Sequence, residues 1–302
     1  MKKNHTAIFL LIGLTIALLA SCGASPVAIE PALYPASGGG SLTASLDVHT
    51  MSALTGLSAA ECAPALWHTD DQTAYLSLLS GENQLIFVSS PPDEETERTA
   101  RINGVSFEMT PVARDALVFY VNDKNPIKSL TKSELARIYA GEITDWRELA
   151  GDHGPIEAYH SADDDFYTRL LSEKIMAGAL PEGGPDEAFL AFADDPLLYD
   201  LSGERAGERP AAYRNTAGAI AYGSRFLLAG SEKERGIALL SLNGITPSPS
   251  NLTSGKYELT YDIYAVILST ARPESAERTV VSWLLSREGK NTVKEAGYAP
   301  VA

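Results

Sequence analysis

The sequence predicts an α/β fold, in which strands alternate with helices along the chain. One observation is the segment DALVFYVN at residues 115–122, a near-continuous apolar run typical of a strand that is covered on both faces of its sheet. A second is that helical segments with start and stop signals separate this strand from the other apolar runs. The chain has 302 residues and is 45% hydrophobic, which fits two packed domains or one large one.

The elements before that strand carry clear end signals. Residues 36–45, ASGGGSLTAS, predict a glycine-rich turn that leads toward a more helical segment. Residues 72–81 favour a helix that stops at Gly81. Residues 84–92, QLIFVSSPP, predict a strand that the two prolines end.

The best-specified helix lies in the segment SLTKSELARIYAGEITDW. Thr131 is its N-cap, and Glu134 completes a capping box. Leu130 and Leu135 form the hydrophobic staple, and Gly141 supplies the residue that stops the helix.

Two further strands and a C-terminal helical region complete the pattern. Residues 218–223, GAIAYG, and residues 261–268, YDIYAVIL, predict strands. Residues 274–297 predict a long helical region that ends at Gly297.

The N-terminal segment is predicted to be a lipoprotein signal. A short basic start precedes an apolar run at residues 7–20, which is about 14 residues long and shorter than the ~20 that a membrane span needs. It ends in LASC, which looks like a bacterial lipobox with Cys22 as the lipidated residue. We therefore expect residues 1–21 to be a signal peptide and residues 22–33 a tether, with two acyl chains giving stable anchoring.

Composition and spacing exclude several classes of function. The formal net charge of -15 argues against a nucleic-acid partner, because phosphate backbones need clustered Lys and Arg side chains. Once Cys22 carries lipid, Cys62 has no partner, so we predict no intrachain disulfide and read Cys62 as a small buried side chain. The sequence has no HExxH motif, no paired cysteines and no G-x-S-x-G motif, so we predict no metal, no cofactor and no enzymatic activity.

Five segments together resemble the phosphate-binding lipoproteins of bacterial ABC importers, a branch of the periplasmic-binding-protein superfamily. They are TAYLSLLSGENQLIFVSSPPDEE, MTPVARDALVFYVNDKNPIKSLTKSELARIYAGEITDWRELAG, TAGAIAYG, LNGITPSPSNLTSGKYELTYDIYAV and VVSWLLSREGKNTVKEAGYAPV. They occur in the family's order and cover most of residues 34–302.

The resemblance implies a two-lobed periplasmic-binding-protein-like fold of type II, with two crossing strands as the hinge. These strands would be residues 115–122 and 218–223. Lobe 1 would comprise residues 34–115 and 223–302, and lobe 2 would comprise residues 116–222. The ligand would lie in the cleft between the lobes, which close on it by a hinge motion.

The same resemblance identifies an altered anion site. The family's signature reads Phe/Tyr-Gln-Arg, three variable residues and then Ser-Gly-Ser-Gln-Thr. On this chain Tyr159 keeps the aromatic residue, Ser161 replaces the Arg, and Asp165 and Tyr167 stand where the two Ser residues would be. An ionised Asp accepts hydrogen bonds and cannot donate them. Two like charges about 4 Å apart repel by roughly 4 kcal/mol at an effective dielectric of 20. A dianion is therefore disfavoured here unless Asp165 is protonated or turned away, or unless residues 163–165 only form a solvated helix cap.

The other half of the expected site resembles the family more closely. GGGSLTAS is similar to the family's Asp-Gly-Ser-Thr loop, which implies that Gly40, Ser41 and Thr43 reach the ligand. A plain flexible turn is the alternative for this loop. Ser89 and Ser90 end a strand and could also reach the cleft, or could serve only as turn residues before the prolines.

Two charged residues flank the predicted crossing strands. Asp115 could contact the ligand, but we favour its pairing with Arg114 as a surface ion pair. Arg225 follows the second crossing strand and is the best remaining cation for the cleft, with a structural role as the alternative.

These features imply an extracytoplasmic solute-binding lipoprotein. It would be a monomer, anchored to the cell membrane by its lipid, and would bring a small-molecule or inorganic anion ligand, phosphate in the family, to an ABC permease. Two alternatives stay open. The aspartates with Tyr159 and Tyr167 could suit a cationic or polyol solute, or the lipoprotein could act as a sensor or interaction module without transport.

Overall fold

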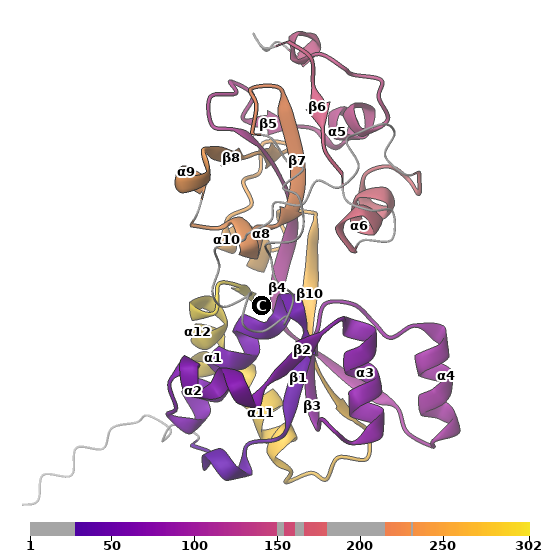
Figure 1. Ribbon diagram of the computed structural model, residues 1–302, viewed down its shortest axis with the longest axis vertical. Helices are drawn as coiled ribbons and strands as arrows, with labels where there is room; N and C mark the ends of the chain where they lie inside the picture. Colours follow the sequence, from indigo (N-terminus) through magenta and orange to yellow (C-terminus); the bar gives the residue numbers. More distant parts are fainter. Residues whose placement is uncertain (1–27, 150–153, 161–165, 180–214, 231) are drawn as a thin grey trace, which may run out of the picture.

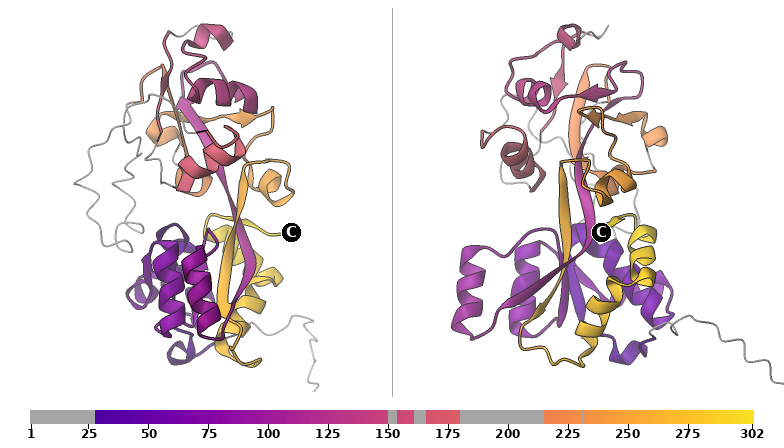
Figure 2. Two further views of the ribbon diagram at one scale, coloured as in Figure 1. Left: turned by 90° about the vertical axis from the view of Figure 1, so that its right-hand side faces the viewer. Right: turned by 180° about the vertical axis from the view of Figure 1, so that it is seen from behind.

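The computed structural model describes residues 28–149, 154–160, 166–179, 215–230 and 232–302. These residues form two lobes, one above the other in Figure 1. β4 (Phe107–Asn122) and β10 (Thr260–Leu268) run side by side through the waist between the lobes (Figures 1 and 2). The two strands pair in antiparallel fashion as far as Ala116 and Thr260.

The strands share a mixed sheet whose order, among the described residues, is β2-β1-β3-β10-β4-β7-β6. The further strands of this sheet are β1 (Ser37–Gly40), β2 (Trp67–Thr69), β3 (Leu85–Val88), β6 (Glu157–Ala158), β7 (Ala219–Ser224), β8 (Ile237–Leu239) and β11 (Ala299–Pro300), the last two pairing with β4. β5 (Ser129–Leu130) and β9 (Ser241–Leu242) pair in a separate two-stranded sheet. β1 runs parallel to β2 and β3, and β10 runs antiparallel to β3 and β4. The carboxyl ends of β1, β2 and β3 therefore point the same way as β4, toward the upper lobe (Figure 1).

Helices cover both faces of the lower sheet, α3 and α4 on one side and α1, α11 and α12 on the other (Figures 1 and 2). The helices are α1 (Ala44–Thr55), α2 (Ala59–Cys62), α3 (Asp71–Ser80), α4 (Glu94–Ile102), α5 (Lys132–Tyr139), α6 (Phe166–Lys174), α8 (Arg225–Leu228), α9 (Glu232–Arg235), α10 (Pro249–Thr253), α11 (Ala276–Leu284) and α12 (Arg287–Glu295). Within the described part of the chain, no helix combines the length and the apolar character that a membrane crossing requires.

The strand side chains divide between the two faces with the expected period of two. Leu85 and Phe87 of β3 pack with α1, α11 and α12, whereas Ile86 and Val88 pack with α3. All four side chains are buried, and so is the apolar run of β4 around Val118. The prediction of a sheet covered on both faces is confirmed, and with it the α/β class.

The lower core encloses a polar pair. Asp47 of α1 and His68 of β2 have fully buried side chains, and His68 Nε2 lies 3.3 Å from Asp47 Oδ2. The Ser37 hydroxyl donates to Asp47 Oδ1 at 2.8 Å. Cys62 is a free cysteine buried in the same core, and its burial is what its apolar surroundings in the sequence predict.

The upper lobe has its own core around the upper part of β4, β7 and α5, to which Trp146 contributes a fully buried indole. Buried side chains from Leu228 to Leu259 also pack into this core. The lobe boundaries given by the sequence analysis, which assign residues 223–302 as a whole to the lower lobe, remain a prediction.

Two elements differ from their sequence predictions. Gly38, Gly39 and Gly40 form strand β1 instead of a turn. A Cβ on Gly38 would lie 2.2 Å from the Trp67 carbonyl oxygen, and one on Gly39 would lie 2.0 Å from that of Phe87, so glycine lets three strands approach closely.

The C-terminal helical region is the second difference, because it divides into α11 and α12. Ser286 caps a new helix there by accepting a hydrogen bond from the Gly289 N–H at 3.1 Å. The chain then ends its last helix beside Gly297, as predicted, with that glycine at a positive φ of 97°.

The capping box of α5 is confirmed, and it allows a first prediction. Thr131 Oγ1 accepts from the Glu134 N–H at 3.1 Å, and Glu134 Oε2 accepts from the Thr131 N–H at 2.7 Å. We expect Thr131→Ala to lower the free energy of unfolding by about 1 kcal/mol, because a helix N–H loses its side-chain acceptor. Urea unfolding measures the loss, with Thr131→Ser, which keeps the hydroxyl, as the control. An equal loss in both variants would contradict this account.

Candidate functional site

Three loops meet at one edge of the lower sheet. β1 ends at Gly40 and is followed by Ser41, β2 is followed by Asp70 and Asp71, and β3 is followed by Ser89 and Ser90. Because parallel strands present their carboxyl ends at the same edge, these loops all face the upper lobe. The sequence placed the first and third of these loops in the ligand site.

Asp71 links the second loop to the third. Its Oδ2 accepts four hydrogen bonds, from the Ser89 N–H at 2.9 Å, the Ser89 hydroxyl at 2.9 Å, the Ser90 N–H at 2.8 Å and the Ser90 hydroxyl at 2.7 Å. Asp70 is the N-cap of α3 and accepts from the Thr73 N–H at 2.9 Å, so its neighbour Asp71 is the first residue of the helix. The two serines predicted to meet a ligand thus bind a carboxylate of the chain itself.

Gly40 completes the space around this carboxylate. A Cβ at Gly40 would lie 2.0 Å from Asp71 Oδ1, so a larger residue at position 40 would require the carboxylate to shift. Thr43, also predicted to reach the ligand, is buried, and its hydroxyl lies 2.8 Å from the Gly40 carbonyl oxygen and 2.7 Å from that of Phe87. That hydroxyl ties β1 to β3 and fixes the loop that holds Ser89.

The environment acts on the acidity of Asp71 in two directions. Burial raises the pKa of this carboxyl above its ordinary value, and the hydrogen bonds from Ser89 and Ser90 oppose the rise. The four donors thus stabilise a charge that burial alone would disfavour.

A second carboxylate lies at the waist. Asp115 is 3% exposed, and its Oδ2 accepts from the Ser224 and Tyr261 hydroxyls, both at 2.6 Å. Its Oδ1 accepts from the Phe226 N–H at 3.0 Å. Burial raises the pKa of Asp115. Burial is also the main reason why the pKa of Tyr261 lies well above its usual value, so the phenol stays neutral and donates its proton to the hydrogen bond.

The expected ion pair between Arg114 and Asp115 is wrong. Successive side chains of a strand point to opposite faces, so the two residues diverge. Arg114 Nε instead donates to Asp262 Oδ1 at 2.8 Å, across the pairing of β4 with β10.

Arg225 also has partners of its own. Its Nε donates to the Pro247 carbonyl oxygen at 2.8 Å and its Nη1 to that of Gly297 at 3.4 Å. Burial lowers the pKa of Arg225, and the nearby charge of Asp115 acts in the opposite sense. These contacts match the structural alternative, while its contact with a ligand stays a prediction.

The altered anion signature is only partly within the described residues. Tyr159 is buried, and its hydroxyl donates to Glu157 Oε2 at 3.2 Å. The Tyr167 hydroxyl on α6 lies 3.5 Å from that of Tyr261, which places it beside the Asp115 group. Ser161, Asp165 and the rest of residues 161–165 lie outside the described residues, so the expected repulsion of a dianion there stays a prediction.

Comparisons with known proteins bear on the family and the fold of the chain. A family model described as "PBP superfamily domain" matches residues 69–288, which is most of the chain. The chain belongs to the PBP superfamily. This is a family of solute-binding proteins and not of enzymes, so the prediction that the chain is no enzyme is confirmed.

Solved structures share the fold of this PBP superfamily member. An ABC-type phosphate transport receptor from Vibrio cholerae matches with a TM-score of 0.58 and 17% identity, over 87% of this chain and 98% of that one. A putative phosphate ABC transporter substrate-binding protein with bound phosphate, from Clostridium perfringens, matches with a TM-score of 0.56 and 16% identity, over 88% and 98%. These matches confirm the two-lobed type II fold.

Two sequence relatives share only about a quarter of their residues with this chain, which is too few to identify its ligand. Protein SphX of Synechococcus elongatus is 26% identical over 74% of this chain and 64% of its own length. Phosphate-binding protein PstS of Bacillus subtilis is 23% identical over 100% of this chain and 95% of its own. The PBP superfamily chain thus spans less than two thirds of SphX.

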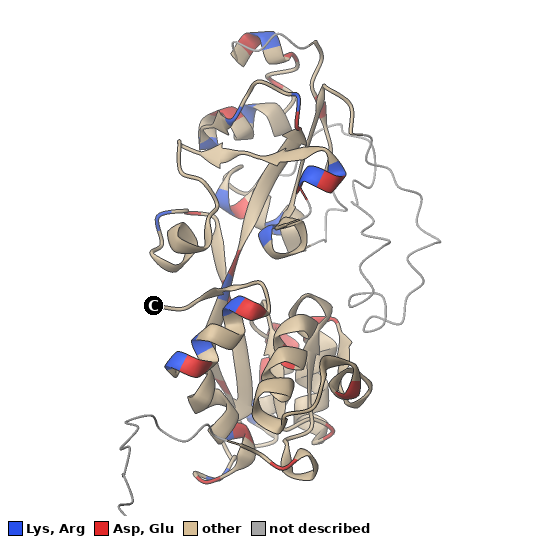
Figure 3. Cartoon of the chain, turned by 90° about the vertical axis from the view of Figure 1, so that its left-hand side faces the viewer, with Lys and Arg blue, Asp and Glu red and all other residues tan. Residues whose placement is uncertain are grey.

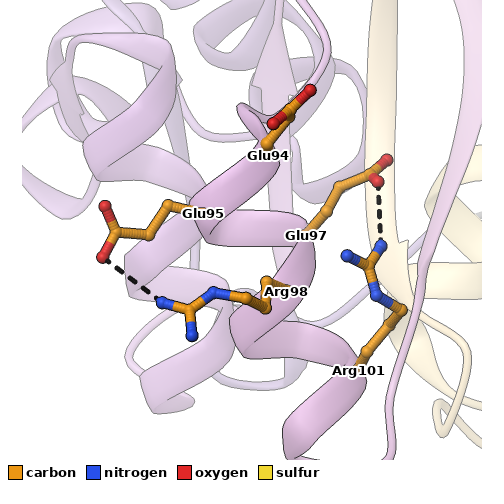
Figure 4. Close-up of a pocket in the computed structure, with 5 residues that line it drawn as sticks. All are labelled: Glu94, Glu95, Glu97, Arg98 and Arg101. Carbon is orange, nitrogen blue, oxygen red and sulfur yellow. Dashed lines mark hydrogen bonds and ion pairs between the residues drawn. The ribbon is translucent and has the colours of Figure 1, made fainter.

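A depression on α4 of this PBP superfamily protein does not look like a ligand site. It is lined by Glu94, Glu95, Glu97, Arg98 and Arg101 on one exposed helix face (Figure 4). Both cations are already paired there, Arg98 with Glu95 at 3.9 Å and Arg101 with Glu97 at 3.1 Å. In the cartoon of Figure 3, Lys and Arg residues of the described part of the chain lie among acidic residues on both lobes.

Sequence analysis of this PBP superfamily chain missed Asp71. The predicted helix began at Gln72, so Asp71 was outside every element considered. A signal was present, because two adjacent aspartates precede a helix and could not both serve as its N-cap.

Proposed function

We propose that the chain is an extracytoplasmic solute receptor of an ABC importer. It would bind a small solute between its lobes, at the edge where the loops after β1, β2 and β3 meet, and would pass it to a permease as a monomer. The convergence of these three loops on the waist carries the proposal, because ligands of open α/β sheets bind at the carboxyl ends of parallel strands. Lipid on Cys22 would hold the receptor at the membrane.

The names of the relatives favour phosphate as the ligand. PstS of Bacillus subtilis and the receptor of Vibrio cholerae are both named for phosphate, and the Clostridium perfringens protein was solved with phosphate bound. On this chain Gly40, Ser41, Ser89 and Ser90 would line the lower side of the site, and Tyr167 would approach from the upper lobe.

One contact favours a different ligand. Asp71 sits among the serine donors that an oxyanion would need, and a carboxylate there repels anions and accepts from amines and hydroxyls. A cationic or polyol solute is therefore the second candidate for the same receptor.

Differential scanning fluorimetry of the full chain in mild detergent tests the proposal. The probes are inorganic phosphate, sulfate, small amines and polyols. A ligand at 100 times its Kd should stabilise the folded state by about 2.7 kcal/mol, which raises the melting temperature by several degrees. We expect such a dose-dependent rise with at least one probe, and failure with all of them would contradict a receptor for these solutes.

A further inference from the structure

The hydrogen-bond donors around Asp71 Oδ2 have the geometry of an oxyanion-binding pocket. Four donors from Ser89 and Ser90 converge on a single oxygen atom within 2.7–2.9 Å. Two are backbone N–H groups, which cannot turn away from the pocket, and two are hydroxyls aimed at the same point. Such convergence suits an atom that only accepts hydrogen bonds and carries negative charge, as in a carboxylate, phosphate or sulfate oxygen.

Other contacts hold the pocket in shape without Asp71. The Tyr75 hydroxyl donates to the Ser90 carbonyl oxygen at 3.0 Å, and Gln72 Nε2 donates to that of Pro91 at 3.1 Å. The Thr43 hydroxyl lies 2.7 Å from the Phe87 carbonyl oxygen at the other end of the loop. The donors therefore stay in place if the carboxylate leaves.

The occupant comes from a different loop than the donors. Asp71 lies 18 residues before Ser89 and 19 before Ser90, so no local turn geometry requires the contact. Its own helix start is already capped by Asp70, and Gly40 leaves the space in which its second oxygen rests. The carboxylate can thus be removed without loss of a cap, a turn or a strand pair.

We propose that Asp71 is a tethered occupant of an oxyanion-binding pocket formed by Ser89 and Ser90. It sets specificity by excluding free inorganic oxyanions from this half of the site. A tethered group competes at an effective concentration in about the millimolar range or above, so a free anion must bind tightly to displace it. The statement that Asp71 excludes oxyanions from the ligand site rests on the proposed function, whereas the occupation of the Ser89–Ser90 pocket by Asp71 does not.

The test compares two adjacent single-charge changes in the full chain. Asp71→Ala empties the pocket, and Asp70→Ala removes the same charge one residue away without touching Ser89 or Ser90. The probes are sodium formate, which restores the lost carboxylate as a free anion, and inorganic phosphate and sulfate at constant ionic strength. Isothermal titration calorimetry gives the Kd, and the shift in melting temperature gives an independent measure.

We expect formate and at least one of the two inorganic anions to raise the melting temperature of Asp71→Ala in a saturable way. The apparent Kd of that anion should fall at least about tenfold relative to both the unaltered chain and Asp70→Ala, because the tethered competitor is gone. Adding Ser90→Ala to Asp71→Ala should reduce this gain, since one donor is lost.

Three results would overturn the proposal. They are tight phosphate binding by the unaltered chain, an equal gain in Asp70→Ala, or no response of Asp71→Ala to any of the three anions. If Asp71→Ala does not fold, Asp71→Asn decides, because its neutral amide is a weaker occupant than the carboxylate and should also bind phosphate more tightly than the unaltered chain. One outcome is shared with the solute screen, because tight phosphate binding by the unaltered chain would support a phosphate receptor and overturn this proposal. The comparison of Asp71→Ala with Asp70→Ala uses only formate and inorganic anions, so it does not depend on whether the screen finds a natural ligand.

Discussion

Asp47→Ala should lower the free energy of unfolding by about 2–6 kcal/mol, because the buried His68 ring and the Ser37 hydroxyl both lose their polar partner, at about 1–3 kcal/mol each. The buried imidazole ring of His68 would lose the carboxylate that lies 3.3 Å away, and the Ser37 hydroxyl would lose its acceptor. Both losses fall in the lower core, where water cannot replace the missing groups. Urea unfolding followed by circular dichroism measures the change in midpoint.

Asp47→Asn is the matched control for this prediction. It keeps the volume and an acceptor oxygen for Ser37 but removes the charge, so its loss should be smaller than that of Asp47→Ala. A loss below about 1 kcal/mol in Asp47→Ala, the range of an exposed ion pair, would show that the contact with His68 contributes little.

Asp115→Ala should lower the free energy of unfolding by about 3 kcal/mol or more, since three buried donors lose their acceptor at about 1–3 kcal/mol each. The donors are the hydroxyls of Ser224 and Tyr261 and the N–H of Phe226. They come from β7, β10 and the start of α8, so the change would loosen the joint between the two lobes. Urea unfolding measures this loss, and a value near zero would contradict it.

The pH dependence of Asp115→Asn gives this prediction a second measurement. Because burial raises the pKa of Asp115, the folded state binds a proton more tightly than the unfolded state does. The resulting contribution to stability is complete below the ordinary pKa of an aspartate, about 3.9, and is lost as the pH rises through the raised pKa. The stability of the unaltered chain relative to Asp115→Asn should therefore decline as the pH rises. A constant difference would contradict the raised pKa.

Local signals were sufficient for the elements that depend on neighbours in the sequence. The capping box of Thr131 and Glu134 lies within four residues, so its geometry follows from the sequence alone. The apolar run of β4 likewise predicted its burial on both faces. In contrast, β1 depends on carbonyl oxygens of Trp67 and Phe87, and a run of three glycines does not reveal such distant partners.

The candidate site was harder to predict for the same reason. Ser89 and Ser90 follow the end of a strand, as the sequence predicted, but their partner Asp71 comes from another loop. Asp115 was assigned to its sequence neighbour, whereas its actual partners include Tyr261, 146 residues away. Hydrogen-bond partners across such distances are fixed by sheet order, which strand patterns alone leave undetermined.

The position of β10 also governs when the molecule can be completed. This strand lies between β3 and β4 in the lower sheet, yet it is made only at residues 260–268 of a 302-residue chain. A nascent chain leaves the ribosome from its N-terminus, so β3 and β4 emerge long before the strand that joins them. Their facing edges stay unpaired through most of synthesis, and such edges readily pair with other chains. The interval before β10 emerges is therefore the period in which the open edges of β3 and β4 are most exposed to pairing with another chain.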